Sequence, residues 1–431
     1  MAFHPSRRAF VAQSLGGALI APAAVDGRLA TADLQASLDK AAQAGGGTVV
    51  IRPGRYVTGT LFLKSNVTLH LAGGATIVGS PNLGDYPSAV ARIRSYTDNY
   101  TEKSLIYGEG LENVTIEGAG TLDGSGKAFK GPYKVRPYMI RLISSKRVTV
   151  TGVAIKDSPM WVQHYMACED VAIRGITVHS RVNANNDGID IDGCDRVRIS
   201  DCDISSGDDA IVIKSTLLRP AKNVVVTNCV LSTHCNALKL GTESNGGFEN
   251  IAVSNCTIYD TRLSGIAIEC VDGGLLERVQ FSNITMNAVG APIFIRLGDR
   301  ARPFEVDGPK QPAGKLRRIM IRDIEAVRAS TNGCAIAGLP GHPLEDITFD
   351  NVRLEFVGGG KPTHKHGEVP ENADKYPEHH MFGTLPAYGF YLRHARRVQM
   401  RNVQARTATP DERPAMLTDD VEHLQVLGSA L

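Results

Sequence analysis

Short runs of alternating apolar residues recur along this chain at intervals of about 23 to 28 residues. Each run begins with a polar residue and is flanked by Gly, Asn, Asp or Ser, the residues that turn a chain. Strict alternation is typical of a half-buried β-strand. The runs are Asn113–Ile116, Arg147–Val150, Asp170–Ile173, Arg196–Ile199, Asn223–Val226, Asn250–Val253, Arg278–Phe281, Arg318–Ile321, Asp346–Phe349 and Arg397–Met400.

No run is followed by a long helical pattern, so helical crossovers cannot join these strands. A solenoid removes the difficulty, because each coil hydrogen-bonds to the next and the inward residues fill one continuous core. We therefore expect an all-β solenoid whose exposed ends need caps. Thr31 has the character of a helix N-cap, with Leu34, Leu38 and Ala41 or Ala42 on one face and Gly45–Gly47 ending the helix. This helix is expected to cover the first coil.

The amino terminus has the features of an export signal. Ser6–Val11 resembles the twin-arginine consensus, an apolar segment runs from Leu15 to Val25, and Ala21–Ala23 is a candidate cleavage site. A disordered terminus with a chance arginine pair is the alternative. We expect residues 1–24 to be a signal peptide and residues 25–431 to form a single β-helix domain. The mature protein would then be soluble, in the periplasm or secreted.

Charge and cysteine usage exclude several partners. The chain has 47 basic and 45 acidic residues, a balance without an electrostatic footprint for nucleic acid. After the amino-terminal segment no apolar run approaches the roughly 20 residues that span a membrane. Cys202, Cys229 and Cys256 occupy the same place in successive repeats, so we expect an inward stack of free thiols. No Cys/His spacing matches a zinc site. A monomer without nucleic-acid or membrane partners is expected.

Two acidic motifs lie about one repeat apart, Asn185–Gly188 and Gly207–Ala210. In a coil of this period, Asp187 would lie within about one inter-strand spacing, roughly 4.8 Å, of Asp208 and Asp209. Crowded carboxylates raise one another's proton affinity, which keeps one of them available as an acid near neutral pH. Inverting glycoside hydrolysis uses such an acid with a carboxylate that activates water, about 6.5–9.5 Å apart. Turn aspartates or a calcium site built from oxygens are the alternatives that geometry alone leaves open.

The stretch from Asp157 to about Gly247 resembles the polygalacturonase family, glycoside hydrolase family 28. The resemblance is carried by Ser158–Trp161, Asn185–Asp190 and Gly207–Ser215, with weaker similarity at Gly45–Val49, Gly118–Gly124 and Arg136–Pro137. It covers most of the mature chain and implies a right-handed parallel β-helix. Carried over by position, it implies that Asp208 is the general acid and that Asp187 and Asp209 hold and activate water. No cofactor or catalytic metal is expected.

The chain departs from the family's pattern at two places. Cys235–Ala237 stands where the family has Gly-His-Gly, so His234 is a candidate replacement imidazole, with a turn histidine as the alternative. Ala267–Glu269 stands where the family has Arg-Ile-Lys, the strand that grips a uronate carboxylate. An anion in place of a cation predicts that a neutral sugar such as rhamnose suits this subsite better than a uronate.

Alternation also predicts which side chains reach the groove floor. If Ile189, Ile211, Leu238, Ile266 and Ile293 point inward, two outward columns follow: Asp190, Val212, Lys239, Ala267 and Phe294, and Asp192, Lys214, Gly241, Glu269 and Arg296. Glu269 is expected to pair with Arg296 or Lys214, as a surface ion pair or while accepting hydrogen bonds from sugar hydroxyls. The candidate substrate-binding residues are Asn185, Asp190, Lys214, His234, Asn236, Lys239, Glu269 and Arg296.

Two long spacings interrupt the repeat, around Arg300–Gly314 and from Gly358 to Tyr388. Loops of that length are often functional. The second is expected to form a lid that closes one end of the groove and favours action on chain ends. Its aromatic residues would stack on sugars, and a metal cluster of its histidines is an alternative to a solvated lid. These residues are Tyr376, Phe382, Tyr388, Tyr391, His364, His366, His379 and His380, while Arg393 and His394 either line the same pocket or are structural.

The expected activity is that of a polygalacturonase-like glycosidase, acting by inverting hydrolysis on galacturonate- or rhamnose-containing pectic poly- or oligosaccharide. A polysaccharide lyase or epimerase on the same fold would need cations beside the substrate carboxylate, and Ala267 with Glu269 argues against it. A non-catalytic carbohydrate-binding solenoid is the second alternative, since fold does not imply function.

Overall fold

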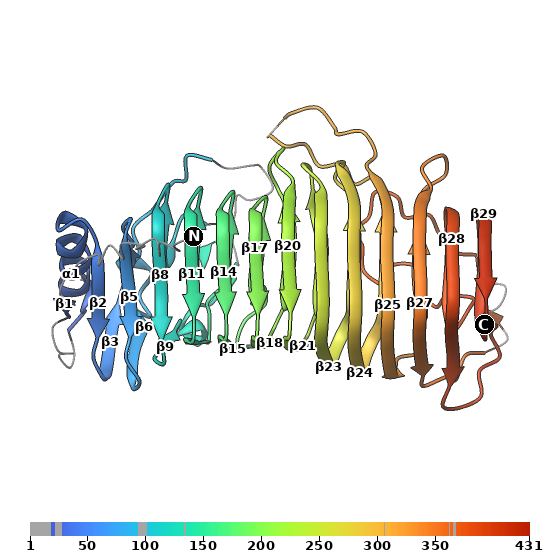
Figure 1. Cartoon of the computed structure of the whole chain (residues 1–431), viewed down its shortest axis with the longest axis horizontal. Coiled ribbons are helices and arrows are strands. Elements are labelled where there is room, and N and C mark those ends of the chain that lie inside the picture. Colours follow the sequence, from blue (N-terminus) through green and yellow to red (C-terminus); the bar gives the residue numbers. More distant parts are fainter. Residues whose placement is uncertain are drawn as a thin grey trace, which may run out of the picture.

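The computed structural model describes residues 19–21, 28–93, 101–132, 135–305, 307–361, 363–364 and 368–431. The strands stack side by side along one long axis, with helix α1 (Thr31–Gln43) at one end and strand β29 (Met416–Leu427) at the other (Figure 1). Successive coils pair in parallel, with the register shifting at a few bends, as between Thr261 and Ser264. The predicted parallel β-helix is confirmed.

Each coil contributes one strand to each of three ladders. The first ladder contains β2 (Gly47–Ile51), β5 (Val67–Leu71), β8 (Glu112–Gly118), β11 (Lys146–Thr151), β14 (Glu169–Arg174), β17 (Asp195–Ser200) and β20 (Ala221–Thr227). The second contains β3 (Gly54–Thr58), β6 (Ala75–Gly79), β9 (Thr121–Asp123), β12 (Ala154–Lys156), β15 (Thr177–Ser180), β18 (Asp203–Ser206) and β21 (Val230–Thr233). The third contains β4 (Leu61–Phe62), β7 (Ser104–Glu109), β10 (Tyr138–Ile143), β13 (Gln163–Met166), β16 (Ile189–Asp192), β19 (Ile211–Ser215), β22 (Leu238–Ser244) and β26 (Cys334–Ala337).

In the later coils the strands run through the bends and belong to more than one ladder. Ile251 pairs with Val224 in the first ladder, and Ile266 of the same strand pairs with Leu238 in the third. These long strands are β23 (Phe248–Cys270), β24 (Leu275–Leu297), β25 (Lys315–Ala329), β27 (Leu344–Phe356) and β28 (Phe390–Thr407).

The backbone conformation explains why a polar residue opens each repeat. At all ten repeats named above it adopts a left-handed backbone with φ of 54–59°. Asn or Asp opens five of these repeats and tolerates this conformation better than other side chains, whereas Arg opens the other five. Their side chains also bond from coil to coil: Asn250 Nδ2 donates to Asn223 Oδ1 at 3.2 Å, and Arg278 Nε donates to Asn250 Oδ1 at 2.7 Å. The opening residue thus turns the chain and ties adjacent coils together.

The interior is a stack of apolar columns. Ile189, Ile211, Leu238, Ile266 and Ile293 are register partners in successive coils, and each is at most 2% exposed. The predicted inward column is therefore confirmed. Cys202, Cys229 and Cys256 form a second buried stack, and all eight cysteines are free thiols.

This burial predicts how the thiols react. Seven of the eight cysteines are buried, and Cys235 alone is partly exposed. A thiol-specific chromogenic reagent should therefore titrate at most one thiol in the folded protein and eight after denaturation, because thiolate chemistry needs access to the sulfur. Burial and the nearby Asp209 and Asp208 raise the pKa of Cys235, so this one thiol should react slowly, and its loss in the Cys235→Ser variant would confirm the assignment. Rapid reaction of three or more thiols in the folded protein would contradict the buried stacks.

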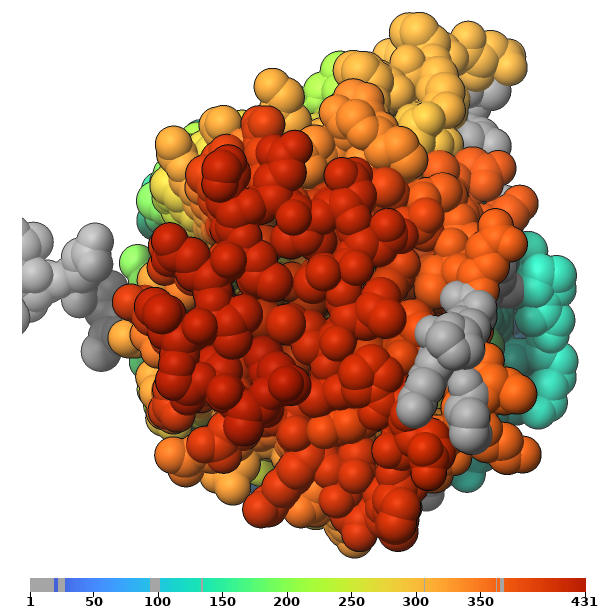
Figure 2. Space-filling model, turned by 90° about the vertical axis from the view of Figure 1, so that its right-hand side faces the viewer, coloured from blue at the N-terminus to red at the C-terminus, as the bar shows by residue number. Residues whose placement is uncertain are grey.

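The two ends of the solenoid differ: a helix caps the first coil, and the last coil is exposed. Helix α1 buries Leu34, Leu38 and Ala41 against the first coil, as predicted. The expected cap was wrong by one residue: Ala30 holds the cap position, and Thr31 Oγ1 instead accepts from Gly59 N at 2.8 Å. At the other end, the last coil forms an exposed surface (Figure 2). Its edge strand β29 carries charged residues, which discourage pairing with another chain.

The export prediction rests on residues that lie mostly outside the described ranges. Within them, β1 (Leu19–Ile20) pairs in parallel with Val49 and Val50 of β2. Among the described residues, no helix is long and apolar enough to cross a membrane.

Candidate active site

The three aspartates come from the turns that lead into the third ladder. Asp187 precedes β16, and Asp208 and Asp209 precede β19. Backbone bonds bring the turns together: Gly188 N donates to Asp209 O at 2.8 Å, and Asp208 N donates to Asn186 O at 3.4 Å. The two acidic motifs therefore lie one above the other, as the repeat period predicts.

Neighbouring loops fix the first of these turns. Asn186 Nδ2 donates to Ser158 O at 2.9 Å and to Met160 O at 3.0 Å. Arg136 donates to Ala184 O at 2.9 Å and to Asn185 Oδ1 at 3.3 Å. At position 188 an added Cβ would lie 2.5 Å from Ala210 O, so the close approach of the two turns requires glycine there.

Asp208 is the aspartate that combines a raised pKa with access to solvent. It is partly exposed, whereas Asp187 and Asp209 are each 3% exposed. Burial and the adjacent Asp209 carboxylate raise the pKa of Asp208, although a hydrogen bond from the Cys235 thiol opposes them. Carboxyl oxygens of both aspartates and the Cys235 Sγ lie within 4.8 Å of one another. Among the described residues, this is the one Cys/His/acid group close enough together to hold a metal ion.

Asp209 is held in its charged form. Lys239 Nζ lies 3.0 Å from Asp209 Oδ2, and Asn236 donates to Asp209 Oδ1 from its backbone N at 3.1 Å and from Nδ2 at 2.9 Å. Burial alone would raise the pKa of Asp209, but Lys239, Lys214 and these bonds outweigh it and lower the pKa. Two adjacent residues thus have pKa values shifted in opposite directions.

Asp187 faces the same cluster. Burial, Asp208 and Asp190 raise its pKa well above the usual range, with Lys214 Nζ opposing at 3.8 Å from Asp187 Oδ2. Its Oδ1 is buried and has no hydrogen-bond partner among the described residues. An unsatisfied oxygen in such a position can bind a water molecule or a sugar hydroxyl.

Lys214 is surrounded by carboxylates. Its Nζ lies 3.5 Å from Asp190 Oδ1 and 3.5 Å from Glu243 Oε2, and it stands 4.6 Å from the centre of the Trp161 ring. Asp190 has no exposed surface, so in this conformation it supports Lys214 from below and does not reach a sugar directly. Glu243 was not predicted, since it follows the regular part of its strand and no motif marks it.

The expected partner of Glu269 was wrong. Glu269 pairs with Lys239, whose Nζ lies 3.7 Å from Glu269 Oε2, because outward side chains of neighbouring columns meet across the coil. Arg296 instead donates to Gly338 O at 2.9 Å and to Glu371 O at 2.6 Å. Glu269 and Arg296 are 0% and 1% exposed, so neither lies on an open groove floor in this structure.

His234 lies on the outer rim and contacts two arginines. Its Nε2 is 3.2 Å from Arg181 Nη1, and its carbonyl accepts from Arg262 Nε at 2.7 Å. Burial and these two cations lower its pKa. The next two residues, Cys235 and Asn236, are the ones that contact Asp208 and Asp209. Cys235 was missed because a lone cysteine in a turn carries no recognisable signal.

The segment between β27 and β28 reaches over this site. Tyr376 OH accepts from Lys239 Nζ at 3.3 Å, and Lys239 and Arg300 each lie 5.4 Å from the centre of the Tyr376 ring. Glu378 adds a carboxyl group whose pKa burial raises to about 7. Glu378 was also missed, because its segment has no periodic pattern that places it.

Several other residues of the expected lid anchor it instead. Phe382 and Tyr391 are 5% and 2% exposed, which leaves no free ring face for a sugar. Arg393 Nε lies 3.0 Å from Asp419 Oδ2, and His394 Nε2 lies 3.0 Å from Glu371 Oε1. Tyr388 OH donates to Ala405 O, and His364 Nδ1 accepts from Lys361 N. His379 is buried with its pKa lowered to about 4, His380 packs edge-on against it, and His366 lies outside the described residues.

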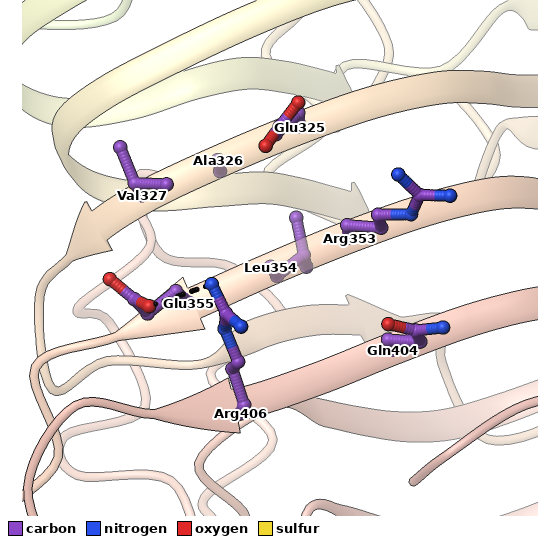
Figure 3. Close-up of a pocket in the computed structure, with 8 residues that line it drawn as sticks. All are labelled: Glu325, Ala326, Val327, Arg353, Leu354, Glu355, Gln404 and Arg406. Atoms are coloured by element: carbon purple, nitrogen blue, oxygen red, sulfur yellow. Dashed lines mark ion pairs between the residues drawn. The ribbon is translucent and has the colours of Figure 1, made fainter.

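A separate hollow lies on β25, β27 and β28 (Figure 3). Glu325, Arg353 and Gln404 line it as register partners of the second ladder, and Glu355 pairs with Arg406 at 3.0 Å. It contains none of the residues described above and presents matched charges, so it offers no comparable chemistry.

Comparison with known proteins identifies the family to which this chain is similar. The model of glycosyl hydrolases family 28 matches residues 57–374. A probable polygalacturonase of Vitis vinifera is 28% identical over 354 residues, which cover 76% of this chain and 71% of that protein. A polygalacturonase of Persea americana is 28% identical over 282 residues, which cover 61% of this chain and 59% of that protein.

Two solved structures share the fold. The exopolygalacturonase from Thermotoga maritima superposes with a TM-score of 0.71 at 21% identity, over 91% of each chain. The family 28 exopolygalacturonase of Yersinia enterocolitica gives 0.73 at 17% identity, over 96% of this chain and 80% of that one. The family model spans most of the chain, including all three aspartates. The chain therefore belongs to family 28 of the glycosyl hydrolases and is a polygalacturonase-like glycosidase.

Proposed function

We propose that this chain is an exported, inverting glycosidase that acts on the ends of pectic poly- or oligosaccharides containing galacturonate or rhamnose. The observation that carries the proposal is the different placement of two adjacent carboxyl groups: Asp209 is buried 3.0 Å from Lys239 Nζ, whereas Asp208 is partly exposed, and their pKa values are displaced in opposite directions accordingly. A site that performs general acid and general base chemistry together needs one protonated and one ionised carboxyl group.

In the proposed reaction, Asp208 gives its proton to the glycosidic oxygen as the bond from that oxygen to the anomeric carbon breaks. A water molecule attacks the anomeric carbon from the opposite face, and Asp209 takes the proton that this water loses. Asp187 orients the water through its unpartnered Oδ1. Lys239 and Asn236 keep Asp209 ionised between turnovers. The nearest carboxyl oxygens of Asp208 and Asp209 lie within 4.8 Å of each other, closer than the roughly 6.5–9.5 Å usual between the acid and base of inverting glycosidases. Inversion is therefore proposed from the family resemblance, and the configuration of the released sugar decides between inversion and retention.

Action on chain ends is supported by the segment that contains Tyr376 and Glu378. Tyr376 stands over Lys239 and Arg300 beside the aspartates, so a polymer lying along the third ladder would meet this segment. A blocked groove admits a chain end more readily than the middle of a chain. Export is supported by the twin-arginine pattern at Ser6–Val11.

The pH dependence of kcat/KM should have an acid limb and an alkaline limb, one below and one above the ordinary pKa range of carboxyl groups. The acid limb reports protonation of Asp209 and should lie below the ordinary carboxyl range, because Lys239 and Lys214 lower that pKa. The alkaline limb reports ionisation of Asp208 and should lie above that range, because burial and Asp209 raise its pKa. A profile with a single limb at the pKa of a free carboxyl group would contradict the two roles.

Product analysis tests the function itself. The purified protein is incubated with polygalacturonate, rhamnogalacturonan and aryl rhamnosides, and the products are resolved by chromatography while ultraviolet absorbance is recorded. Release of short saturated sugars from at least one substrate is expected. New absorbance from a carbon–carbon double bond would indicate a lyase instead, and binding without any product would indicate a carbohydrate-binding solenoid.

A further inference from the structure

Lys239 is a buried ammonium group with more carboxyl neighbours than it can neutralise. It is 2% exposed, with Asp209 at 3.0 Å and Glu269 at 3.7 Å. Glu378, from the segment that lies over the site, is electrostatically coupled to the same ammonium group. Three acidic side chains therefore share one cation at this end of the site.

Three further cations near the aspartates are committed to carboxyl groups in the same way, whereas Arg136, Arg181 and Arg262 bond to carbonyl, amide, hydroxyl or imidazole groups. Lys214 lies among Asp187, Asp190 and Glu243. Arg300 donates to Asp272 Oδ1 at 2.8 Å, and Arg302 donates to Glu243 Oε1 at 2.7 Å and to Asp272 Oδ2 at 3.2 Å. A carboxylate on a bound sugar would have to compete with these internal anions for every one of the four charges.

Glu378 has an acceptor atom to offer a sugar. The residue is partly exposed and stands two positions after Tyr376, which contacts Lys239. Glu378 Oε2 has no hydrogen-bond partner among the described residues and is covered in this structure, so a sugar hydroxyl that reaches it displaces the atoms that cover it. A hydroxyl group can donate to this oxygen, whereas a uronate carboxylate has no proton to donate and would repel it. Glu269 contributes indirectly, since it has no exposed surface and acts by occupying Lys239.

We propose that Glu378 is a specificity-determining residue, which accepts a hydroxyl hydrogen bond from an uncharged sugar at the covered end of the groove and disfavours a uronate there. This inference rests on the proposed function and narrows its substrate class. It assigns a role to a residue that the repeat pattern does not place.

The preference should depend on pH, because burial raises the pKa of Glu378 to about 7. The titratable and charged groups that face it are Lys239, Asp208, Asp209, Glu269 and Cys235. Below that pKa the group is neutral and repels a uronate little. Above it the group is charged, and discrimination against the uronate is strongest.

The test compares two matched substrates at pH values below and above 7. One is trigalacturonate, and the other is the same trimer after its carboxyl groups have been reduced to primary alcohols. For the wild type, the ratio of kcat/KM for the reduced trimer to that for trigalacturonate should rise by about tenfold as pH increases through the Glu378 titration. In Glu378→Gln the ratio should be lower at the higher pH and nearly independent of pH. Titration of the catalytic aspartates changes kcat/KM for both substrates by the same factor, so it cancels in the ratio of the two kcat/KM values.

Glu368→Gln is the matched control, because Glu368 belongs to the same segment and is exposed. It should reproduce the wild-type ratio at both pH values, and unchanged thermal midpoints would show that both variants are folded. If the wild type cleaves at least one trimer but Glu378→Gln retains the pH-dependent ratio, this inference is wrong and the proposed function stands. If the wild type and the Asp208→Asn variant are equally inactive on both trimers and on the pectic panel, both fail together.

Discussion

Replacing Asp208 by asparagine is expected to lower kcat by about 10²–10⁴-fold, the usual contribution of a positioned general acid. The amide keeps the size of the side chain but cannot give a proton to the glycosidic oxygen. The fold should survive, because Asp208 accepts a hydrogen bond from Asp209 N at 2.9 Å and the amide oxygen can accept the same bond. Thermal stability should stay equal or rise, since the substitution removes one of several crowded carboxyl groups.

Asp203→Asn provides the control for this experiment. Asp203 is an exposed residue of β18, in the same coil but on the second ladder. Its substitution should leave kcat and KM unchanged. Initial rates on the best pectic substrate, together with thermal melting curves, separate lost chemistry from lost folding. An Asp208→Asn variant with activity within a few-fold of the wild type would contradict the assignment of the acid.

Replacing Lys239 by methionine is expected to have the largest effect on stability. Lys239 is buried beside Asp209 and Glu269, so its removal leaves two buried carboxyl groups without their cation. Removing one partner of a buried ion pair typically costs about 3–5 kcal/mol. Denaturant unfolding of the two proteins at neutral pH measures the difference. The double variant Lys239→Met/Glu269→Gln should recover part of it, because one of the stranded charges is then absent.

The same substitution should also move the pH profile. Lys239 lowers the pKa of Asp209, so without it this pKa rises and the acid limb of kcat/KM moves to higher pH. A surface lysine offers the comparison: Lys310→Met removes an exposed cation, paired with Asp299, from another part of the chain. That variant should keep both the stability and the profile of the wild type. A Lys239→Met protein with unchanged stability and an unchanged acid limb would show that the buried pair does not control Asp209.

The features that repeat were predictable from the sequence. The polar residue and alternating run at each coil predict the strands, and the period predicts that Gly188 and Asp209 meet. The inward column at Ile211 and Leu238 follows from alternation alone. These predictions succeed because a solenoid makes sequence separation equivalent to distance along its axis.

The features that do not repeat were harder to predict. Glu378 and Tyr376 reach the site from a segment with no strand period, and Tyr376 is 137 residues from its partner Lys239. The pairing of Glu269 with Lys239 depends on side-chain reach between neighbouring columns, which alternation does not specify. Arg296 donates to the carbonyl of Gly338, which follows β26, and to that of Glu371 in the covering segment, and no pattern in its own strand indicates those partners.

The configuration of the first-formed product tests the account most directly. If Asp208 acts as the acid while Asp209 and Asp187 deliver water to the opposite face, each cleavage inverts the anomeric carbon. Proton NMR, recorded before the released sugar mutarotates, distinguishes the two anomers. We predict that an α-linked pectic oligosaccharide yields the β-anomer first. Initial release of the α-anomer would mean a covalent, retaining mechanism and would contradict the roles assigned to the three aspartates.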